Sequence, residues 1–426
     1  MMPFLRVPQA GAKRLAATLY AYMFLDDFIL LYPVYALLFA ETGLSTAEIS
    51  SLFVIWSLTS LVLEIPSGVW ADVFSRRLLL VLAPLLSAAG YALWIAAPSY
   101  GAFAVGFVLW GTAGALQSGA MEALVYTELE RLDAAGRYAA VMGRARALST
   151  VAVMVATAVA APVLAWGGYP ALAVMSVLAC VLCAAVAMTF PEHRVKAQGE
   201  EGPGESPLRA YTAVLRDGVR EARASRPIRR ALLLVAGVTA VWGALEEYVS
   251  LLAAGSGVAA YAVPLLVLLV SAGVALGGLL AAAGRGLTDR GLAGVLGIGA
   301  AALAAGAVSG VAAGFFAIAG AFCLFQLATV LADTRLQERI TGPARATVTS
   351  LAGLGTEVAG LGVYGVYAAA STVAGHGVIF AAFAVPYVVI AGALIMGGRS
   401  RPGDGRRSPG GELTSADPAS PPGRSS

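Results

Sequence analysis

The chain alternates between long apolar stretches and clusters of basic residues. Every lysine and arginine falls into one of seven clusters, and six stretches without a basic residue lie between them. The six stretches span residues 15–75, 78–130, 147–193, 231–284, 291–334 and 346–398. A helix needs about 20 residues to cross the hydrocarbon core of a bilayer, so each stretch has room for two crossings and a turn. The pattern therefore predicts six helical hairpins, or twelve transmembrane helices.

The turns at the middle of the hairpins carry no lysine or arginine. Loops on the cytoplasmic side of a membrane carry an excess of basic residues, whereas outside loops do not. We therefore expect the basic clusters and both termini to lie in the cytoplasm, and the protein to lie in the plasma membrane. The outside turns are expected at Glu41–Glu48, Pro98–Gly101, Trp166–Pro170, Ala254–Val258, Val308–Val311 and Ser371–Gly377.

A long polar segment divides the apolar pattern into two halves. We interpret residues 193–228 as a cytoplasmic linker between six-helix bundles at 1–192 and 229–398. Within the linker, Ser206–Pro207 is typical of a helix start. Apolar residues then recur at helical spacing from Leu208 to Val219, which favours an amphipathic helix on the membrane surface. A solvated linker is the alternative. Residues 399–426 are rich in Pro, Gly, Ser and Arg, and are expected to be disordered.

Composition agrees with a membrane protein. Of the 426 residues 59% are hydrophobic and 12% are charged, whereas soluble domains carry about 25% charged residues. Mean hydropathy is +0.80. These features predict an all-α integral membrane fold of two pseudo-symmetric six-helix bundles. Cys180 and Cys183 form a C-x-x-C inside an apolar run, which we interpret as helix packing because a metal site needs further Cys or His nearby.

Motifs for nucleotide or hydrolytic chemistry do not occur in the sequence. There is no Gly-x-x-x-x-Gly-Lys-[Ser/Thr], which excludes an ATP-driven pump within this chain. There is also no His-Glu-x-x-His or Gly-x-Ser-x-Gly, so no hydrolase machinery is visible. We therefore expect neither an enzyme nor a cofactor.

Acidic residues inside the predicted helices are the candidates for function. An acid at the centre of a bilayer costs about 2.5–3.5 kcal/mol on insertion scales, so it is expected to face a cavity or a partner. Desolvation favours the protonated carboxyl, which suits a group that picks up and releases a proton. A purely structural pairing is the alternative for each acid. The candidates are Asp26, Asp27, Glu64, Glu122, Glu246, Glu247 and Glu357.

Four of these acids form two adjacent pairs, and the two pairs belong to an internal repeat. An acid–acid–aromatic triplet occurs at Asp26–Phe28 and again at Glu246–Tyr248, 220 residues later, in the first predicted helix of each half. Secondary transporters are commonly built from such repeats, with the binding site near the midplane between them. Adjacent helical residues point about 100° apart, so one member of each pair is expected to face the cavity. A polar or small stripe of Thr239, Gly243, Glu246 and Ser250 favours Glu246, while Asp26 and Asp27 remain equal candidates.

The stretch Glu64–Arg77 carries the most specific motif. Gly68, Asp72, Arg76 and Arg77 match the pattern Gly-x-x-x-Asp-Arg-x-Gly-Arg-Arg, and the stretch resembles the loop between helices two and three of the major facilitator superfamily. The resemblance implies a conformational lock that bridges helices two and eleven and stabilises the outward-facing state. Asp72 would then meet the start of helix eleven near Pro343–Ser350, and Arg76 or Arg77 would reach Glu128 or Glu130. The corresponding stretch Gly277–Arg290 lacks the acid, which implies a weaker lock in the second half.

Further stretches bear on the direction of transport. Ala161–Gly168 is similar to the Gly-Pro-x-x-Gly-Gly signature of exporting members, although its first glycine is absent. The arginine that many proton antiporters of the superfamily carry in helix four has no counterpart in residues 108–120. We predict a monomeric secondary transporter, with no nucleic acid partner, that exports a small amphipathic compound in exchange for protons. Acids and aromatic rings favour a cation as cargo. The alternatives are proton-coupled uptake of a metabolite and a non-transporting sensor or assembly protein.

Overall fold

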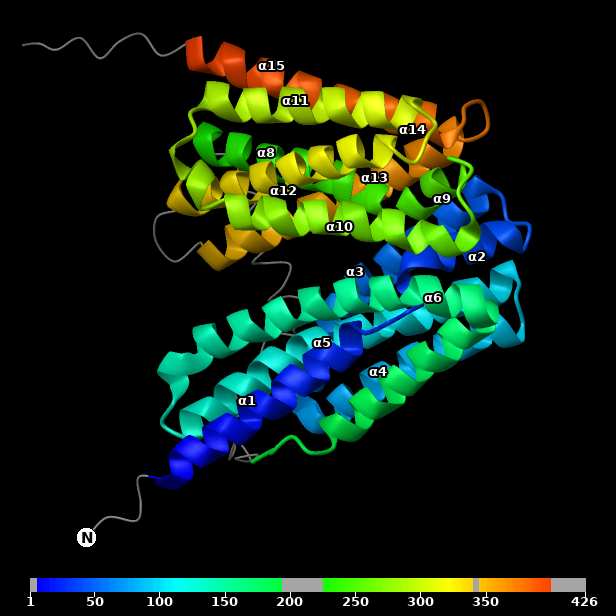
Figure 1. Ribbon diagram of the computed structural model, residues 1–426. Coiled ribbons are helices and arrows are strands. Elements are labelled where there is room, and N and C mark those ends of the chain that lie inside the picture. Colours follow the sequence, from blue (N-terminus) through cyan, green and yellow to red (C-terminus); the bar gives the residue numbers. More distant parts are fainter. Residues whose placement is uncertain (1–5, 194–224, 340–344, 400–426) are drawn as a thin grey trace, which may run out of the picture.

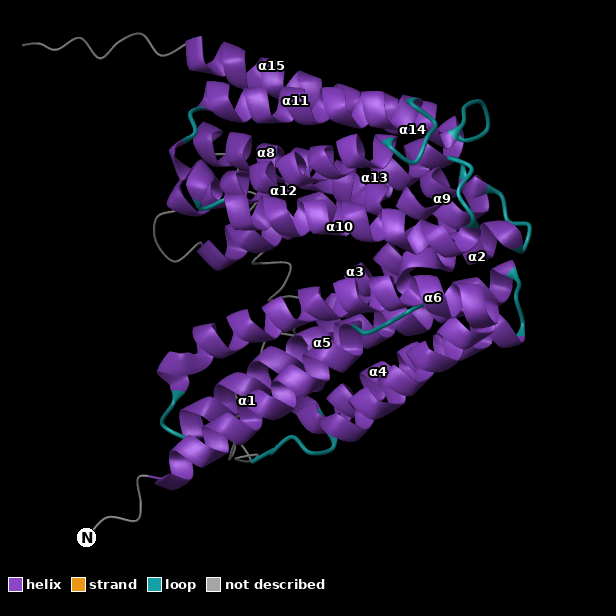
Figure 2. Ribbon diagram, in the orientation of Figure 1, coloured by secondary structure: helices purple, strands orange, loops and turns teal. Residues whose placement is uncertain are grey.

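Helices and turns make up the part of the chain that the structure describes, with no strand among residues 6–193, 225–339 and 345–399 (Figure 2). The structure is a computed structural model. A helix satisfies every backbone donor and acceptor within one segment, which a bilayer without water demands. The predicted amphipathic helix of the linker and the C-terminal tail lie outside the described residues.

The first bundle is built from a broken first helix and from four further α-helices, of which one folds back on itself. Residue Gly168 adopts φ +63° inside α6, so the ribbon labelled α6 comprises two antiparallel helices. The elements are α1 (Arg6–Asp27), η1 (Tyr32–Val34), α2 (Tyr35–Glu41), α3 (Thr46–Val73), α4 (Arg76–Ala96), α5 (Tyr100–Arg131), η2 (Ala135–Arg137) and α6 (Tyr138–Ala187).

The second bundle repeats this plan. Its first helix is also broken, between α8 and α9, and its last helix is interrupted at Phe383. The elements are α8 (Arg226–Glu246), α9 (Val249–Ala254), η3 (Ala260–Ala262), α10 (Val263–Leu280), η4 (Ala283–Gly286), α11 (Asp289–Val308), α12 (Gly314–Arg339), α13 (Arg345–Ala370), α14 (His376–Ala382) and α15 (Ala384–Arg399).

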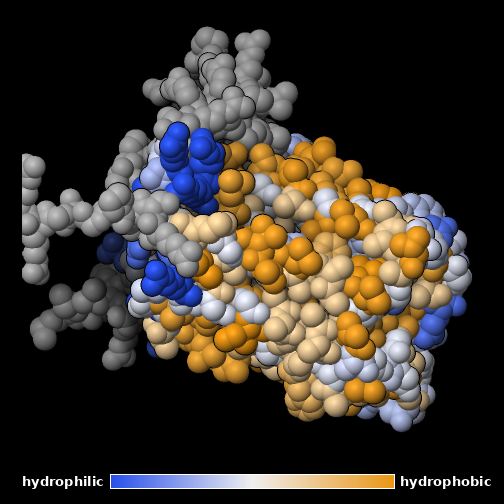
Figure 3. All heavy atoms as spheres, turned by 90° about the horizontal axis from the view of Figure 1, so that it is seen from above, coloured by the Kyte–Doolittle hydropathy of each residue, from blue (hydrophilic) through white to orange (hydrophobic). Residues whose placement is uncertain are grey.

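The described helices arrange as twelve crossings, which confirms the predicted fold class. Nine segments of the described residues are long and apolar enough to span a membrane, and one of them, 135–187, is the folded-back α6. Helices α5 and α13 complete the set. Apolar side chains cover the middle of the face seen in Figure 3, and hydrophilic ones gather toward the two ends. The predicted outside turns coincide with the observed helix ends.

Hydroxyl side chains start several helices at both ends of the molecule. A serine or threonine at the N-cap accepts a hydrogen bond from a backbone N–H of the first helical turn, which would otherwise lack a partner. The N-cap residues are Ser45, Ser75, Ser99, Ser225 and Thr288. At Ser45 the cap is reciprocal, because Glu48 accepts from the Ser45 backbone N–H in return.

The two bundles meet at one end of the molecule and diverge at the other (Figure 1). At the end where they meet, which we call the closed end, α2 contacts α9, α6 contacts α10 and α3 contacts α13. The other end carries the start of α1 at Arg6 and the end of α15 at Arg399, and we call it the terminal end.

The signature stretch differs from its predicted form. It was expected to be a loop from Glu64 to Arg77, but α3 continues as a helix through Pro66 to Val73. The turn consists of Phe74 and Ser75 alone, and α4 begins at Arg76. Pro66 has no N–H and removes one backbone hydrogen bond inside α3, but the helix continues past it.

Candidate functional site: a pair of acidic cavities between the bundles

Two adjoining cavities lie between the bundles. One has a volume of about 480 Å³ and the other about 890 Å³, and Trp56 and Gly114 line both. Side chains of α3, α5, α8 and α13 form the smaller cavity, on the terminal-end side of the helix breaks. The cavities therefore occupy the space that the diverging bundles leave between them.

Breaks in two helices position the acid pairs at these cavities. Helix α1 ends at Asp27 and the chain resumes as a helix at Tyr32, while α8 ends at Glu246 and resumes at Val249. The acid–acid–aromatic triplet therefore marks the same break in both bundles. Discontinuous helices at the level of the substrate are a recurrent feature of transporters, because irregular backbone is tolerated in a membrane where it borders a cavity.

Three acids line the larger cavity: Asp26, Asp27 and Glu246. Asp26 accepts a hydrogen bond of 2.6 Å from Nε2 of Gln117 on α5. All three acids are half-buried. The cavity wall also contains Tyr32, Tyr91 and Trp110.

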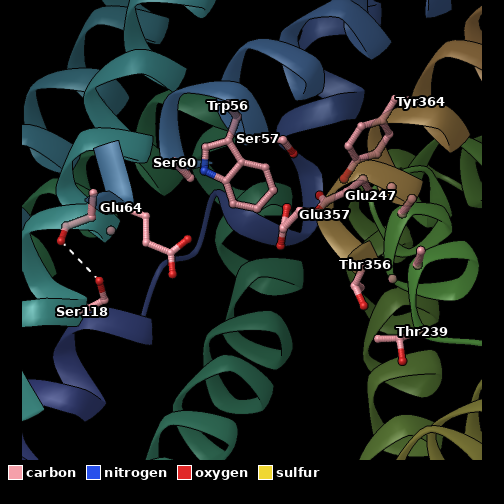
Figure 4. Close-up of a pocket in the computed structure, with 16 residues that line it drawn as sticks. Trp56, Ser57, Ser60, Glu64, Ser118, Thr239, Glu247, Thr356, Glu357 and Tyr364 are labelled. Carbon is pink, nitrogen blue, oxygen red and sulfur yellow. Dashed lines mark hydrogen bonds between the residues drawn. The ribbon is translucent and has the colours of Figure 1, made fainter. Parts of the chain in front are cut away.

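Three further acids line the smaller cavity: Glu64 on α3, Glu247 at the α8 break and Glu357 on α13 (Figure 4). Glu247 accepts a hydrogen bond from the hydroxyl of Tyr35 in the opposite bundle. The ring of Trp56 stands in this cavity and stacks on Trp110, with ring centroids 5.4 Å apart and planes inclined by 24°.

Both members of the second acid pair reach a cavity wall. The helical-stripe argument favours Glu246 alone because it assumes a helix that continues to Ser250. Glu247 keeps helical backbone angles at the end of α8, so its side chain points about 100° away from that of Glu246, and it lines the smaller cavity while Glu246 borders the larger one.

Neither cavity has a lysine or arginine among its described lining residues, whereas six carboxyl groups line them. Carboxylates close together without a basic partner are mutually repulsive, and a bound cation or proton relieves that repulsion. Stacked indole rings add a surface that attracts cations. The arrangement is suited to binding positive charge.

Glu122, the remaining predicted acid, lies outside these cavities. It is an exposed residue of α5 and pairs with Arg146 of α6, with Oε1 and Nη2 3.2 Å apart. Gly114, Ser118 and Glu122 follow each other at intervals of four along α5, and the first two line the cavities. Glu122 therefore lies beyond the cavities, toward the terminal end.

The predicted conformational lock is described in part. Gly68 and Asp72 belong to α3, but their side chains lie outside the described part of the structure, as do residues 340–344 before α13. The prediction that Asp72 meets the start of helix eleven thus stays a prediction. Arg77 is exposed at the start of α4.

Arg76 joins several elements at the terminal end. Its Nη1 donates to Oγ1 of Thr127 at 2.9 Å and to the carbonyl of Ala123 at 3.0 Å, and its backbone N–H donates to Glu192 at 2.7 Å. Glu128, one of the predicted partners, is buried and contacts Arg131 and His193. These contacts bind the α3–α4 turn, the end of α5 and the end of α6 together.

Two contacts of the cavity acids were not foreseen from the sequence, those of Gln117 and Tyr35. Gln117 is an amide in an otherwise apolar or small stretch of α5. Such an isolated polar residue inside a predicted membrane helix is a signal that the sequence contains. Tyr35 carries no comparable signal, because the chain contains 15 tyrosines and its partner is 212 residues away.

Comparison with known proteins gives a consistent picture. A family model described as Major Facilitator Superfamily matches residues 16–363. The fold is similar to that of a bacterial homolog of the human lysosomal transporter Spinster, in a structure described as inward-facing and unoccupied. The TM-score is 0.69 at 16% identity, over 92% of this chain and 97% of that one.

Two further solved structures share the fold. The nucleoside transporter NupG has a TM-score of 0.67 at 13% identity, covering 92% of this chain and 100% of that one. A D-xylose–proton symporter has a TM-score of 0.62 at 15% identity, covering 90% of this chain and 96% of that one. The comparison with curated proteins finds no match to this sequence.

Proposed function

Because this chain belongs to the major facilitator superfamily, we propose that it is a secondary active transporter that exports a small amphipathic cation in exchange for protons. Access alternates as the two bundles rock about the acidic cavities. Membership of the superfamily supports the general function, transport of small molecules across a membrane. The acidic cavities support the choice of cargo and of coupling ion.

The observation that carries the proposal is the charge of the cavity walls. Six acids and no lysine or arginine stand among the described lining residues of the two cavities. An anionic cargo would meet repulsion there, while a cation gains both charge attraction and contact with the Trp56–Trp110 stack.

Exchange follows from competition for the same carboxyl groups. A carboxyl group that holds a proton is neutral and offers no charge to a cation, so proton and cargo exclude each other at Asp26, Asp27, Glu246 or Glu247. Proton entry on one side and cargo release on that side are then linked. This exclusion supports antiport.

The distribution of basic residues supports an export orientation. Helix ends at the terminal end carry Arg76, Arg131, Arg226 and Arg339. The positive-inside rule assigns this end to the cytoplasm, and the cavities on this side of the helix breaks are then loaded from the cytoplasm. We propose that the protein acts as a monomer in the plasma membrane with both termini inside.

Uptake by proton symport is the second candidate. It is favoured by the shared fold with a protein described as a D-xylose–proton symporter, because symport moves the cargo and the proton in the same direction. The acidic walls are compatible with symport only for a cargo that binds together with the proton.

Purified protein in liposomes with a pH-sensitive dye inside separates the two candidates. With an acidic lumen, addition of tetraphenylphosphonium outside should raise the lumenal pH, because each cation that enters releases protons outward. The dye signal should require the protein and should be absent in Glu246→Gln liposomes. Acidification of the lumen on cargo addition would support symport, and no response to cationic, neutral or anionic compounds would contradict transport.

A further inference from the structure

Hydrogen bonds that cross between the bundles hold the closed end. Tyr35, the first residue of α2, donates its hydroxyl to the carboxylate of Glu247. Tyr248 donates its hydroxyl to Oγ of Ser50 on α3 at 2.7 Å. Tyr35 is 3% exposed, and Tyr248 and Ser50 are buried. A buried donor or acceptor that loses its partner costs free energy, because water does not replace the lost hydrogen bond. Both bonds therefore stabilise the closed end.

Both crossing bonds come from consecutive residues at one helix break. Glu247 and Tyr248 lie between the end of α8 and the start of α9, and adjacent side chains diverge, so one meets Tyr35 and the other meets Ser50. A change of backbone at this break displaces both bonds together. The break is therefore a mechanical connection between the cavity acid and the contact surface of the two bundles.

Glu247 also faces the cargo. It lines the cavity of about 480 Å³ together with Thr239, Gly243 and Tyr364 (Figure 4). On its other side it borders a void of about 20 Å³ that Tyr32 and Tyr35 also line. The carboxylate thus stands at the boundary between the cavity and the closed end.

We propose that Glu247 is both a ligand of the cargo and the acceptor of the closed-end bond, and that Tyr35 positions it, so that cation binding releases Tyr35 and opens the closed end. The inference rests on the proposed function in one respect, the positive charge of the cargo. A cation close to the carboxylate gains a charge–charge attraction that the neutral phenol of Tyr35 lacks, so the cation displaces Tyr35 from Glu247. A ligand shifts a conformational equilibrium only by its differential affinity for the two states. Competition between the cation and Tyr35 for Glu247 supplies this difference in affinity.

The ring of Tyr35 offers a conservative test. It packs against Phe39, Phe53, Trp94 and Phe107, with centroid distances of 5.6–6.0 Å. Tyr35→Phe keeps these contacts and removes only the hydroxyl. Tyr22→Phe is a matched control, because the Tyr22 hydroxyl is equally buried and donates to the carbonyl of Leu80 within the same bundle, at 3.2 Å.

The experiment measures the distance between the bundles at the closed end. Spin labels are placed at Gly101→Cys in the first bundle and Val373→Cys in the second, both exposed, while the native cysteines Cys180, Cys183 and Cys323 are buried. Distance distributions are recorded by double electron–electron resonance in liposomes. Tetraphenylphosphonium should lengthen the distance in the parent protein. Tyr35→Phe should populate the longer distance without any cation, by about ten-fold, the change expected for loss of one hydrogen bond to a charged group.

The coupling itself is read from the double variant. Glu247→Leu, which removes the acceptor, should shift the distance as Tyr35→Phe does, and the combination should shift it no further, because both changes remove the same bond. Tyr22→Phe should leave the distribution as in the parent. A Tyr35→Phe protein that keeps the parent distribution would overturn the inference.

The outcomes keep this inference apart from the proposed function. If the parent exchanges tetraphenylphosphonium for protons but Tyr35→Phe stays closed, the closed-end bond is refuted and the function stands. If Tyr35→Phe opens the closed end but the parent neither carries nor responds to the cation, the release step and the cargo class are both refuted.

Discussion

The two bundles place the same acid–acid–aromatic triplet at the same helix break, yet the acids find different partners. In the first bundle Asp26 bonds to Gln117 of its own bundle. In the second bundle Glu247 bonds to Tyr35 of the opposite bundle, and Tyr248 bonds to Ser50 there. The repeated motif thus makes two kinds of contact. The first copy bonds within its own bundle, whereas the second copy bonds to the opposite bundle.

The largest effect should come from the second copy. Glu246→Gln keeps the shape of the side chain but removes a carboxyl group that lines the larger cavity. Loss of one charged partner in a buried site is worth about 3 kcal/mol or more, so proton-driven flux should fall about 100-fold or more. The dye assay measures this, and size-exclusion chromatography checks that the variant is folded. Flux near that of the parent would remove Glu246 from the coupling site.

The first copy should affect affinity and leave the conformation unchanged. Asp26→Asn preserves an acceptor for the Gln117 amide and loses one charge among several, so the half-saturating concentration of a cationic cargo should rise about ten-fold. The closed-end distance between labels at 101 and 373 should not change, because Asp26 has its partner inside one bundle. A longer distance between the labels in the Asp26→Asn protein would contradict the proposed difference between the two copies of the triplet.

The features of the fold that the sequence predicts are those that insertion into a bilayer requires. The length of the apolar stretches and the placement of arginines and lysines predict the hairpins and their turns, because insertion constrains both length and charge. The cost of a carboxylate in the bilayer singled out the acids that line the cavities. The repeat at Asp26–Phe28 and Glu246–Tyr248 was expected inside continuous helices, whereas in the structure both copies lie at a helix break.

The remaining contacts depend on how helices pack, which local patterns do not encode. The bond from Gln117 to Asp26 spans 91 residues and that from Tyr35 to Glu247 spans 212. The assignment of one cavity-facing acid per pair assumed a single cavity, whereas Glu246 and Glu247 line two different ones. The signature stretch was expected to be a loop because it resembles the loop between helices two and three of the superfamily, but α3 continues as a helix to Val73.

The turns at the terminal end extend the comparison of the bundles. Ser75 and Thr288 are the N-caps of α4 and α11, and the first helical residues that follow are Arg76 and Asp289. Arg76 bonds to Thr127, four residues before the end of α5, and Asp289 bonds at 2.9 Å to Arg335, four residues before the end of α12. The same contact therefore occurs in both bundles, with the basic residue on opposite helices.

An intermediate effect on stability should follow from this second contact. Arg335 is only 18% exposed, so Asp289→Ala leaves a largely buried charge with the Leu287 carbonyl as a partner. The loss of a hydrogen bond to a charged group is worth about 1.5–3 kcal/mol, so the unfolding midpoint should fall by several degrees. Thr127→Val in the first bundle should cost less, because Arg76 keeps its bond to Ala123. Scanning fluorimetry in detergent compares the two, and equal shifts would contradict a difference between the bundles.

The smallest effect is expected at Glu122, which separates the cavity acids from those that only lie near them. Its ion pair with Arg146 is exposed, at 56% and 72% of the two side chains, and exposed pairs contribute about 0–1 kcal/mol. Glu122→Gln should therefore change the half-saturating concentration by less than about five-fold, and high salt should abolish the difference because it screens exposed charges. Arg146→Gln should act in the opposite direction, because removal of its positive charge favours entry of a cation. If Glu122→Gln instead reduced proton-driven flux as strongly as Glu246→Gln, the coupling site would extend along α5 beyond Ser118. The second copy of the triplet would then no longer differ from Glu122 in its effect on flux.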